Sequence, residues 1–228
     1  MQSILVLNSK GGCGKTTIAT NLASRFASDG AKVIFADYDP QGSGLSWLEK
    51  RPAHCPAILG IAAWRDPIRA PQKPDYLIMD APARVAGAEF KLLMRHANTI
   101  LIPVLPSPID IRACAQFMRH VLLAHRALQH AGRLAVVANR VREATRIYDK
   151  LHRFLSSLEI PFIATLRETQ NYIRAAEQGL GIFELPGNSA AADIAQWDPL
   201  LAWLRAPASA NDEVLFLPTE PATEQKHI

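Results

Sequence analysis

The 228-residue chain has only three cysteines and no long apolar run, and each shortage excludes a class of protein. The cysteines, Cys13, Cys55 and Cys114, stand at no metal-ligand spacing, and their small number fits a reducing compartment. No apolar stretch reaches the roughly 18–20 residues that a membrane-spanning helix needs. No basic segment precedes the first apolar run, so the sequence shows no sign of a secretion signal. We therefore expect a cytoplasmic protein that does not cross a membrane.

Basic and acidic residues are unevenly distributed, although the net charge is only +4. Residues 112–174 carry eleven lysines and arginines against four acidic residues, a net charge of +7. Residues 175–228 carry two against eight, a net charge of −6. A basic middle third is typical of a chain that binds a polyanion, and nucleic acid is the first candidate. A solvated, arginine-rich helix face is the alternative explanation.

A glycine-rich segment near the N-terminus carries the strongest functional signal. It follows Ser3–Leu7, an apolar run of strand length, and precedes an amphipathic segment with Ile18, Leu22 and Phe26 on one face. Its sequence is Ser9-Lys10-Gly11-Gly12-Cys13-Gly14-Lys15-Thr16-Thr17. Glycines between a strand and a helix N-terminus let backbone N–H groups converge on anionic oxygens. The segment therefore predicts a phosphate-binding loop and a nucleotide site.

Three side chains distinguish this loop. The general pattern predicts that Lys15 reaches the β- and γ-phosphates and that the Thr16 hydroxyl binds Mg²⁺. The same pattern begins with glycine, where this chain has Ser9, and it does not require a second lysine at the position of Lys10. The signature of this chain is therefore K-G-G-x-G-K-T-T.

Acidic residues end two predicted strands. The nearly continuous apolar run 32–36 leads into Asp37 and Asp39, and the run 75–79 leads into Asp80. Because open α/β sheets bind ligands at the carboxyl ends of their strands, these side chains are expected beside the phosphate-binding loop. Asp80 has the Walker B arrangement and is expected to hold Mg²⁺ through water. The Asp37/Asp39 pair suits water positioning and contact with Mg²⁺.

Strand and helix patterns alternate along the rest of the chain. Strand patterns lie at 57–61, 99–105, 134–138 and 161–165. Helix patterns lie at 45–48, 89–97, 109–130, 147–158 and 190–204, and one more helix pattern ends at 178. The alternation predicts a single doubly wound, mainly parallel α/β sheet with helices on both faces, in one domain over 1–205 that carries the P-loop. Residues 206–228 are acidic and contain prolines, so we expect a flexible tail, in which only 214–217 could dock as a strand.

The predicted helix 109–130 combines an apolar face with a basic stripe. The expected buried residues are Ile111, Ala115, Met118 and Leu122. The basic residues recur every seven positions and therefore share one stripe: Arg112, Arg119 and Arg126. Three histidines have no cysteine or carboxylate at ligand spacing and are expected on the surface: His120, His125 and His130.

With these motifs the chain resembles the ParA family of deviant-Walker P-loop ATPases, from residue 3 to about 204. The matching segments are K-G-G-C-G-K-T-T, D-Y-D-P-Q-G-S, Y-L-I-M-D-A-P-A, I-P-V-L-P-S-P-I-D and the stretch 167–179. The first is highly specific for the deviant-Walker group, and the second favours ParA within it. The P-S-P-I-D part and the last stretch are most similar to small ParF-like plasmid-partition proteins and orphan cargo-positioning relatives.

The resemblance implies an ATPase that uses ATP and Mg²⁺ and forms a nucleotide-sandwich homodimer. Lys10 would reach the phosphates bound by the other subunit, and Asp39 would orient the attacking water, so the catalytic side chains would be Lys10, Lys15 and Asp39. The implied nucleotide contacts are Gly11, Gly12, Cys13, Gly14, Lys15, Thr16, Thr17, Asn139 and Arg140, the last two near the adenine base. The metal would be bound or supported by Thr16, Asp37 and Asp80.

The resemblance also implies partners. The ATP-bound dimer would bind DNA without sequence specificity through arginines of residues 112–174. A small ParB-like or cargo-adaptor protein would stimulate hydrolysis, so that the ATPase segregates a plasmid or positions another cargo. This implies a cytoplasmic, nucleoid-associated protein.

Three other functions share the nucleotide chemistry. A MinD-like membrane-cycling ATPase needs a basic amphipathic C-terminal helix, whereas residues 211–228 are acidic and interrupted by proline. A metabolic enzyme with the same P-loop would be a synthetase or a reductase with a bridging iron–sulfur cluster. The cluster version needs a suitable cysteine pair in each subunit, and Cys55 and Cys114 match no such motif. A VirC-type conjugation protein that binds DNA near a transfer origin is the third alternative.

Overall fold

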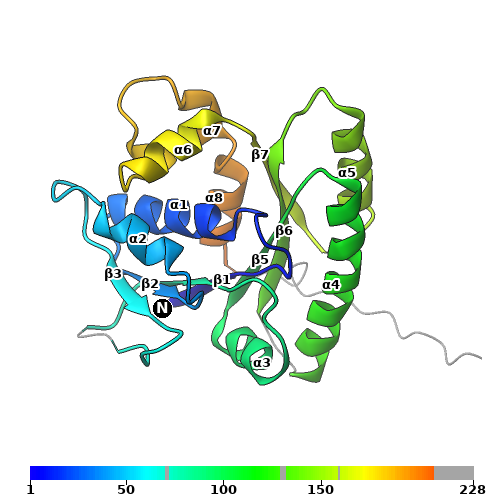
Figure 1. Cartoon of the computed structure of the whole chain (residues 1–228), viewed down its shortest axis with the longest axis horizontal. Coiled ribbons are helices and arrows are strands. Elements are labelled where there is room, and N and C mark those ends of the chain that lie inside the picture. Colours follow the sequence, from blue (N-terminus) through cyan, green and yellow to red (C-terminus); the bar gives the residue numbers. More distant parts are fainter. Residues whose placement is uncertain (70–71, 129–131, 159, 208–228) are drawn as a thin grey trace, which may run out of the picture.

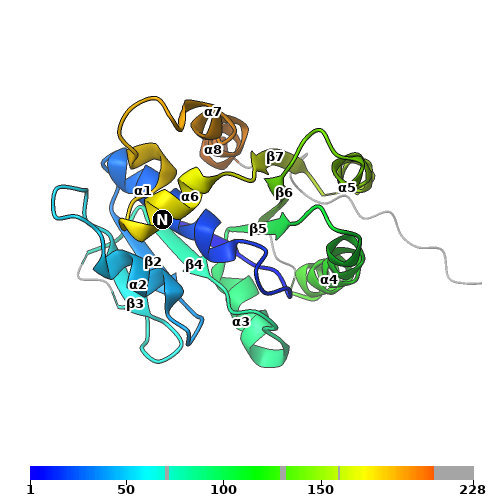
Figure 2. The same ribbon diagram turned by 45° about the horizontal axis from the view of Figure 1, so that its top comes forward.

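The computed structural model describes residues 1–69, 72–128, 132–158 and 160–207, which form one seven-stranded sheet covered by helices on both faces (Figures 1 and 2). The strands are β1 (Gln2–Val6), β2 (Val33–Asp37), β3 (Leu59–Ala62), β4 (Tyr76–Asp80), β5 (Thr99–Val104), β6 (Arg133–Val141) and β7 (Phe162–Arg167). Their order is β3-β2-β4-β1-β5-β6-β7, and all neighbouring pairs are parallel. This confirms the predicted doubly wound α/β fold.

The helices form two groups, one on each face of the sheet. One face carries α1 (Lys15–Ser28), α2 (Ser43–Glu49), α6 (Gln170–Glu177), the 3₁₀ helix η1 (Ile182–Glu184), α7 (Ala191–Ala195) and α8 (Asp198–Arg205). The other carries α3 (Gly87–His96), α4 (Pro108–Ala127) and α5 (Arg146–Ser156). Because side chains alternate along a strand, Ile4 and Val6 pack into the first core, and Leu5 into the second. Burial on both faces explains why the strands are continuous apolar runs.

Local sequence signals set the helix ends that surround the sheet edge. Gly30 follows α1 with φ 86°, the left-handed conformation that ends helices at little steric cost. The hydroxyl of Ser107 accepts the backbone N–H of Asp110 at 3.1 Å, and Pro108 occupies the first turn of α4, where no backbone donor is needed. The first turn of α4 is therefore firmly placed.

A proline lies inside β5, an interior strand of the sheet. Pro103 pairs with β6 on one side, and on the other side β1 has already ended, because its pairing with β5 stops at Leu101. The carbonyl of Pro103 accepts the Asn8 side-chain amide at 2.6 Å on that open side. The missing N–H of proline therefore breaks no ladder hydrogen bond.

The C-terminal region differs from the single helix predicted over 190–204. α7 ends at Ala195 and α8 begins at Asp198, with Trp197 fully buried between them. Pro199 cannot donate the backbone hydrogen bond that a continuous helix would need, but it is tolerated in the first turn of a new one. The chain therefore turns at Trp197 and packs its indole into the core.

The buried face of α4 is also rotated from the predicted one. Met118 is buried as expected, but its buried neighbours are Cys114, Phe117, Val121 and His125. The expectation that His125 lies on the surface is wrong, because its Nε2 lies 2.9 Å from the carbonyl oxygen of Gly132 and this partner makes burial of the ring acceptable. His120 is exposed, as predicted.

Several expectations lie outside the described residues, namely His130, the tail 208–228 and the strand predicted over 214–217. In the part of the chain that the structure describes, no helix has the length and apolar character needed to cross a membrane.

Candidate functional site

Loops at the carboxyl ends of β1, β2, β4 and β6 bring the predicted site residues to one edge of the sheet. β4 lies between β1 and β2, and the register places Asp80 beside both Val6 and Asp37. The loop that follows β1 leads directly into α1 (Figure 1). The phosphate-binding loop and the acidic strand ends are therefore neighbours, as the strand pattern predicted.

The backbone of the loop has the geometry of an anion site. Gly12 and Gly14 have φ values of 75° and 91°, which favour glycine. A Cβ at Gly14 would also collide with the side-chain nitrogen of Asn139. No side chain caps the N-terminus of the 14-residue α1, so its first backbone N–H groups have no intrahelical partner. Such donors, with the positive end of the helix dipole, bind an oxyanion well.

The two lysines of the loop have different surroundings. Lys15 is buried, and its Nζ donates to the carbonyl oxygen of Lys10 at 3.1 Å, which holds the ammonium against the loop backbone. The Lys10 side chain is 40% exposed, and its Nζ lies 3.7 Å from Oδ1 of Asp110 in the first turn of α4. Lys15 is thus fixed inside its own site, whereas Lys10 remains accessible from outside.

Asp80 is a buried carboxylate whose oxygens are available as metal ligands. It is 1% exposed, and neither of its oxygens has a hydrogen-bond partner among the described residues. Burial raises its pKa to about 7, a rise opposed by the Thr16 hydroxyl and increased by the Asp37 charge. Mg²⁺ prefers oxygen ligands, so a carboxylate with two free oxygens beside a threonine hydroxyl fits this ion.

Asp37 is also buried, but its oxygens are occupied. Oδ1 accepts the backbone N–H of Asp39 at 3.0 Å, and Oδ2 accepts those of Gly44 at 3.0 Å and Leu45 at 3.3 Å. Burial raises the pKa of Asp37, and these three bonds oppose the rise. Asp37 therefore fixes the loop after β2 and the start of α2.

Asp39 lies in the turn that Asp37 holds. One of its carboxylate oxygens accepts the backbone N–H of Gln41 at 3.0 Å, and its carbonyl accepts that of Gly42 at 2.8 Å. The side chain is half-buried. The turn therefore holds a partly accessible carboxylate at the same edge as the phosphate-binding loop.

A cavity of about 480 Å³ opens beside the loop. Its walls come from the loop, the end of β6, the end of β7 and α6: Gly12, Gly14, Thr17, Asn139, Arg140, Arg142, Arg167, Glu168, Thr169, Gln170, Tyr172 and Ile173. A cavity of about 520 Å³ lies at the opposite edge of the sheet, among residues such as Arg95 and Arg205, and no predicted site residue lines it. Of these two cavities, the first is therefore the one that the phosphate-binding loop lines.

Asn139 and Arg140 have distinct roles in this cavity. Asn139 is buried, and its side-chain amide donates to the carbonyl of Cys13 at 2.9 Å, which ties the loop to β6. Arg140 is exposed with φ 53°, and its guanidinium pairs with Glu168 at 3.0 Å. Arg142 pairs with the same carboxylate at 2.7 Å, and these contacts lower the pKa of Glu168.

Sequence reasoning missed Asn8, Asp110 and Glu168 as parts of the site. Asn8 accepts the backbone N–H of Lys10 at 3.1 Å, and Asp110 and Glu168 pair with Lys10 and Arg140. Of the three, only Asp110 had a local signal, because Ser107-x-x-Asp110 matches the pattern of a capped helix start.

The site and the sheet beneath it coincide with a known domain. The sequence profile of the CobQ/CobB/MinD/ParA nucleotide binding domain, CbiA, matches residues 4–182, which contain every residue of the site. The chain belongs to this family. It is a P-loop ATPase of the ParA type.

Relatives within the family agree in sequence and in fold. The chain is 30% identical over 203 residues to "Maintenance of carboxysome distribution protein A" of Halothiobacillus neapolitanus, covering 85% of this chain and 93% of that protein. Apo McdA of Cyanothece superposes with a TM-score of 0.71 at 17% identity, covering 90% of this chain and 99% of that one. A plasmid partition protein of Borrelia burgdorferi bound to AMPPNP superposes with a TM-score of 0.70 at 16% identity, covering 89% and 99%.

Proposed function

We propose that this ATPase positions a cargo by cycling between a DNA-bound ATP dimer and a released form. The observation that carries the proposal is the convergence of Lys10, Lys15 and three aspartates at one sheet edge. The similarity to a carboxysome-distribution protein and to a plasmid partition protein supports a positioning role. The cargo is a plasmid or a protein assembly, and a small ParB-like or cargo-adaptor protein is the partner that stimulates hydrolysis.

Nucleotide and metal bind to separate parts of the site in this proposal. The loop backbone over 11–14, Lys15 and Thr17 hold the phosphates, and the cavity beside Asn139 and Arg140 receives the adenine. Thr16 and Asp80 bind the Mg²⁺, and Asp37 supports it by fixing the adjacent loop. Bound Mg²⁺ would neutralise charge on the phosphates during phosphoryl transfer.

Lys10 and Asp39 serve the dimer and the hydrolysis step. Lys10 is accessible, so in a sandwich dimer it can leave Asp110 and neutralise the phosphates of the facing subunit. Asp39 orients the attacking water, which is a positioning task rather than covalent chemistry. Hydrolysis detaches the γ-phosphate, and its release as inorganic phosphate removes the charge that Lys10 binds, so that the dimer separates.

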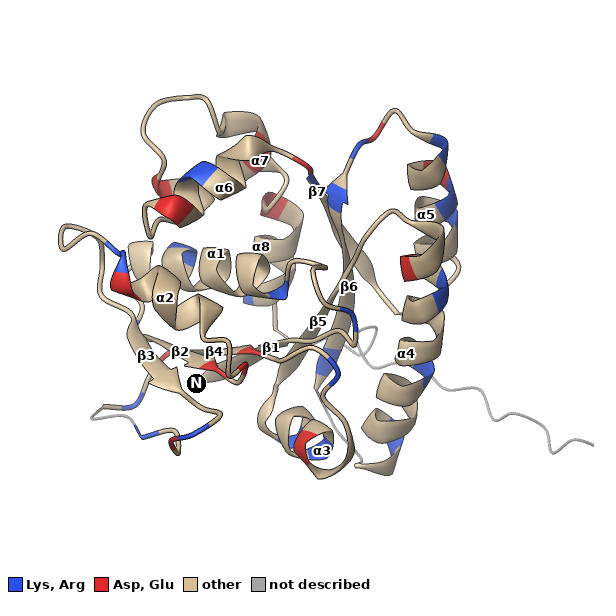
Figure 3. Ribbon diagram, in the orientation of Figure 1, with Lys and Arg blue, Asp and Glu red and all other residues tan. Residues whose placement is uncertain are grey.

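The DNA-binding surface is the outer side of α4 and α5, where lysines and arginines gather (Figure 3). The exposed basic residues there are Arg112, Arg119, Arg126, Arg146, Lys150 and Arg153. Contacts from such side chains to phosphates carry no sequence information, so duplexes of all sequences should bind about equally. This binding would associate the protein with the nucleoid.

The test is duplex binding by the purified protein with ATP and Mg²⁺, with ADP and Mg²⁺, or without nucleotide, measured by fluorescence anisotropy on two unrelated sequences. We expect ATP-dependent binding that is equal for the two sequences and weakens steeply with salt. A parallel arm uses anionic vesicles. Vesicle binding without DNA binding would favour the membrane-cycling alternative and reject the proposal, as would strong preference for one sequence.

A further inference from the structure

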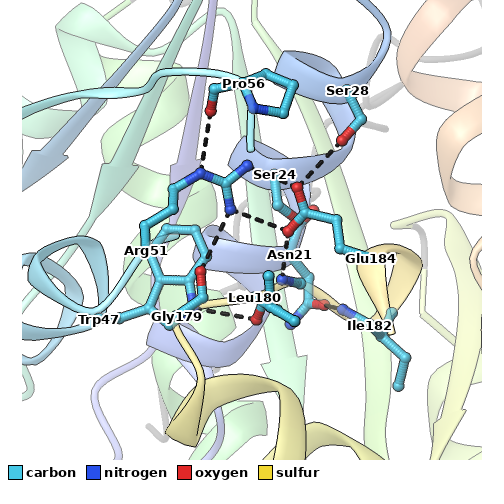
Figure 4. A network of polar contacts seen from close by, with 11 residues as sticks. Asn21, Ser24, Ser28, Trp47, Arg51, Pro56, Gly179, Leu180, Ile182 and Glu184 are labelled. Atoms are coloured by element: carbon cyan, nitrogen blue, oxygen red, sulfur yellow. Dashed lines mark hydrogen bonds and ion pairs between the residues drawn. The ribbon is translucent and has the colours of Figure 1, made fainter. Parts of the chain in front are cut away.

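A buried arginine–glutamate pair lies next to the site and joins separate segments of the chain (Figure 4). Arg51, directly after α2, donates from Nη1 and Nη2 to the two carboxylate oxygens of Glu184 in η1 at 2.9 and 2.6 Å. The two side chains are only 6% and 10% exposed. Arg51 also donates to the carbonyls of Gly179 at 3.3 Å and Pro56 at 3.0 Å. A two-pronged guanidinium contact fixes orientation as well as distance.

A second contact joins the same two segments. The indole N–H of Trp47 in α2 donates to the carbonyl of Leu180 at 3.1 Å, and the Arg51 guanidinium lies 5.5 Å from the centre of the Trp47 ring. Gly179 has φ 67°, and a Cβ there would collide with the backbone of Lys50 and Arg51. The segment 179–184 therefore packs directly on the backbone at the end of α2.

The segment 179–184 is in turn fixed to α1. Asn21 of α1 accepts the backbone N–H of Ile182 at 2.6 Å, and Ser28 donates to Glu184 at 3.2 Å. The side-chain amide of Asn21 donates to the carbonyl of Thr17 at 2.7 Å, in the first turn after the phosphate-binding loop. The segment 179–184 is therefore connected, through Asn21, to the start of α1 at the phosphate-binding loop.

At its other end, α2 is bonded to the turn that contains Asp39. The N-terminal amides of α2, from Gly44 and Leu45, bind the Asp37 carboxylate, which also binds the backbone N–H of Asp39. α2 has only seven residues, too few for a helix to be stable without tertiary contacts. The contacts at its C-terminal end therefore decide where its N-terminal end, and the turn beside it, lie relative to α1.

We infer that Arg51 and Glu184 are positioning residues for ATP hydrolysis, which set the Asp39 turn against the phosphate-binding loop. The inference rests on the proposed role of Asp39 in orienting water. Neither residue lines the nucleotide cavity, so ATP binding does not require the pair, whereas attack by a correctly placed water does. A displacement of about 1 Å can cost on the order of 100-fold in rate.

The test is Arg51→Lys, which keeps the positive charge but removes the two-pronged guanidinium contact with Glu184. We expect kcat for ATP hydrolysis to fall by about tenfold or more, while the affinity for ATP and Mg²⁺ changes by less than about threefold. Hydrogen exchange should increase selectively in the peptide that contains Gly44 and Leu45. The control is Arg205→Lys, because the Arg205–Asp29 ion pair lies at the C-terminal end of α1, at the opposite end of that helix from the phosphate-binding loop.

A second variant keeps the inference falsifiable if Arg51→Lys does not fold. Trp47→Phe removes the indole N–H that donates to Leu180 while keeping an aromatic ring beside Arg51, and it should lower kcat in the same direction by a smaller factor. Unchanged kcat in the folded variants would overturn the inference, as would a fall that only mirrors lost ATP affinity. If Asp39→Ala hydrolyses ATP at the wild-type rate, the role assigned to Asp39 is wrong, and the positioning inference fails with it. If Asp39→Ala abolishes hydrolysis and Arg51→Lys does not change it, the positioning inference alone fails.

Discussion

At the scale of single residues, burial separates the two loop lysines. Lys15 is held against the loop backbone by its bond to the Lys10 carbonyl, so its charge is already in place before phosphate arrives. A charge-assisted hydrogen bond contributes about 1.5–3 kcal/mol. Lys15→Ala should therefore weaken ATP binding by roughly 10- to 100-fold in isothermal titration calorimetry. Lys32→Ala, at an exposed position before β2, is the control and should bind normally. Normal binding by both variants would contradict the assignment of the loop.

The buried carboxylate of Asp80 makes the stability of the metal-free protein depend on pH. Its pKa is raised from 3.8 to about 7, so the folded state keeps a proton that the unfolded state has lost. The contribution to stability is therefore fully present below pH 4 and is lost as pH rises through 7, on the order of 4 kcal/mol.

Thermal unfolding of Asp80→Asn tests this pH dependence. An amide does not titrate, so Tm of the variant should fall less between pH 5 and pH 8 than Tm of the wild type, by several degrees at about 2–4 °C per kcal/mol. Asp37, whose pKa is raised too, titrates in both proteins, so the difference between the two curves reports Asp80 together with its coupling to the Asp37 charge. Parallel curves for the two proteins would refute the assignment of a raised pKa to Asp80.

The sequence predicted those site residues that belong to continuous patterns. Asp80 ends an apolar run, and Lys15 and Thr16 stand in a glycine-rich loop, so their neighbourhood follows from the rule for parallel sheets. Arg51 and Glu184 are 133 positions apart, and no local pattern signals that an arginine after one short helix will meet a glutamate in a 3₁₀ turn. Such pairs depend on how the elements pack.

At the scale of elements, strands and long helices were predictable, as was the buried face of α1 with Ile18, Leu22 and Phe26, but the buried face of α4 was not. The run 134–138 predicted β6, and 109–130 predicted α4, because period and length distinguish them. Which side of α4 is buried depends on the surface against which the helix packs. Phe117 packs into the core on this face of the sheet, and the ring of His125 can be buried because the Gly132 carbonyl is its polar partner. The division of α7 from α8 was indicated only by Pro199.

The basic stripe of α4 gives a prediction at this scale. If Arg112 and Arg119 neutralise DNA phosphates, Arg112→Ala and Arg119→Ala should each weaken binding of the ATP form to all duplexes equally. Each should also reduce the slope of log affinity against log salt by about 0.9. Arg65→Ala, in the exposed loop after β3, is the control. Anisotropy titrations at several salt concentrations measure both quantities, and an unchanged slope would exclude α4 from the DNA-binding surface.

At the scale of the whole molecule, one subunit brings together the proposed phosphate site and an exposed lysine, Lys10, whose partner is Asp110. The Lys10 side chain is 40% exposed and its Nζ lies 3.7 Å from Asp110, and a long ion pair with an exposed partner contributes about 0–1 kcal/mol. If Lys10 exchanges Asp110 for the phosphates of a facing subunit, the free-energy cost is therefore small, and the charges of the two facing nucleotides are neutralised. Dimerisation should depend on Lys10, and its reversal should depend on hydrolysis through Asp39.

Lys10→Ala and Asp39→Ala should therefore fail in opposite ways. With ATP and Mg²⁺, Lys10→Ala should bind nucleotide and remain monomeric in analytical ultracentrifugation, because the facing phosphates repel each other, and its DNA binding should fall with dimerisation. Asp39→Ala should bind ATP, dimerise and stay on DNA, because only the exit through hydrolysis is blocked. Asp110→Ala is the matched control: it removes the resting partner of Lys10 and should dimerise at least as well as the wild type. A Lys10→Ala protein that dimerises normally would show that this lysine acts only within its own subunit.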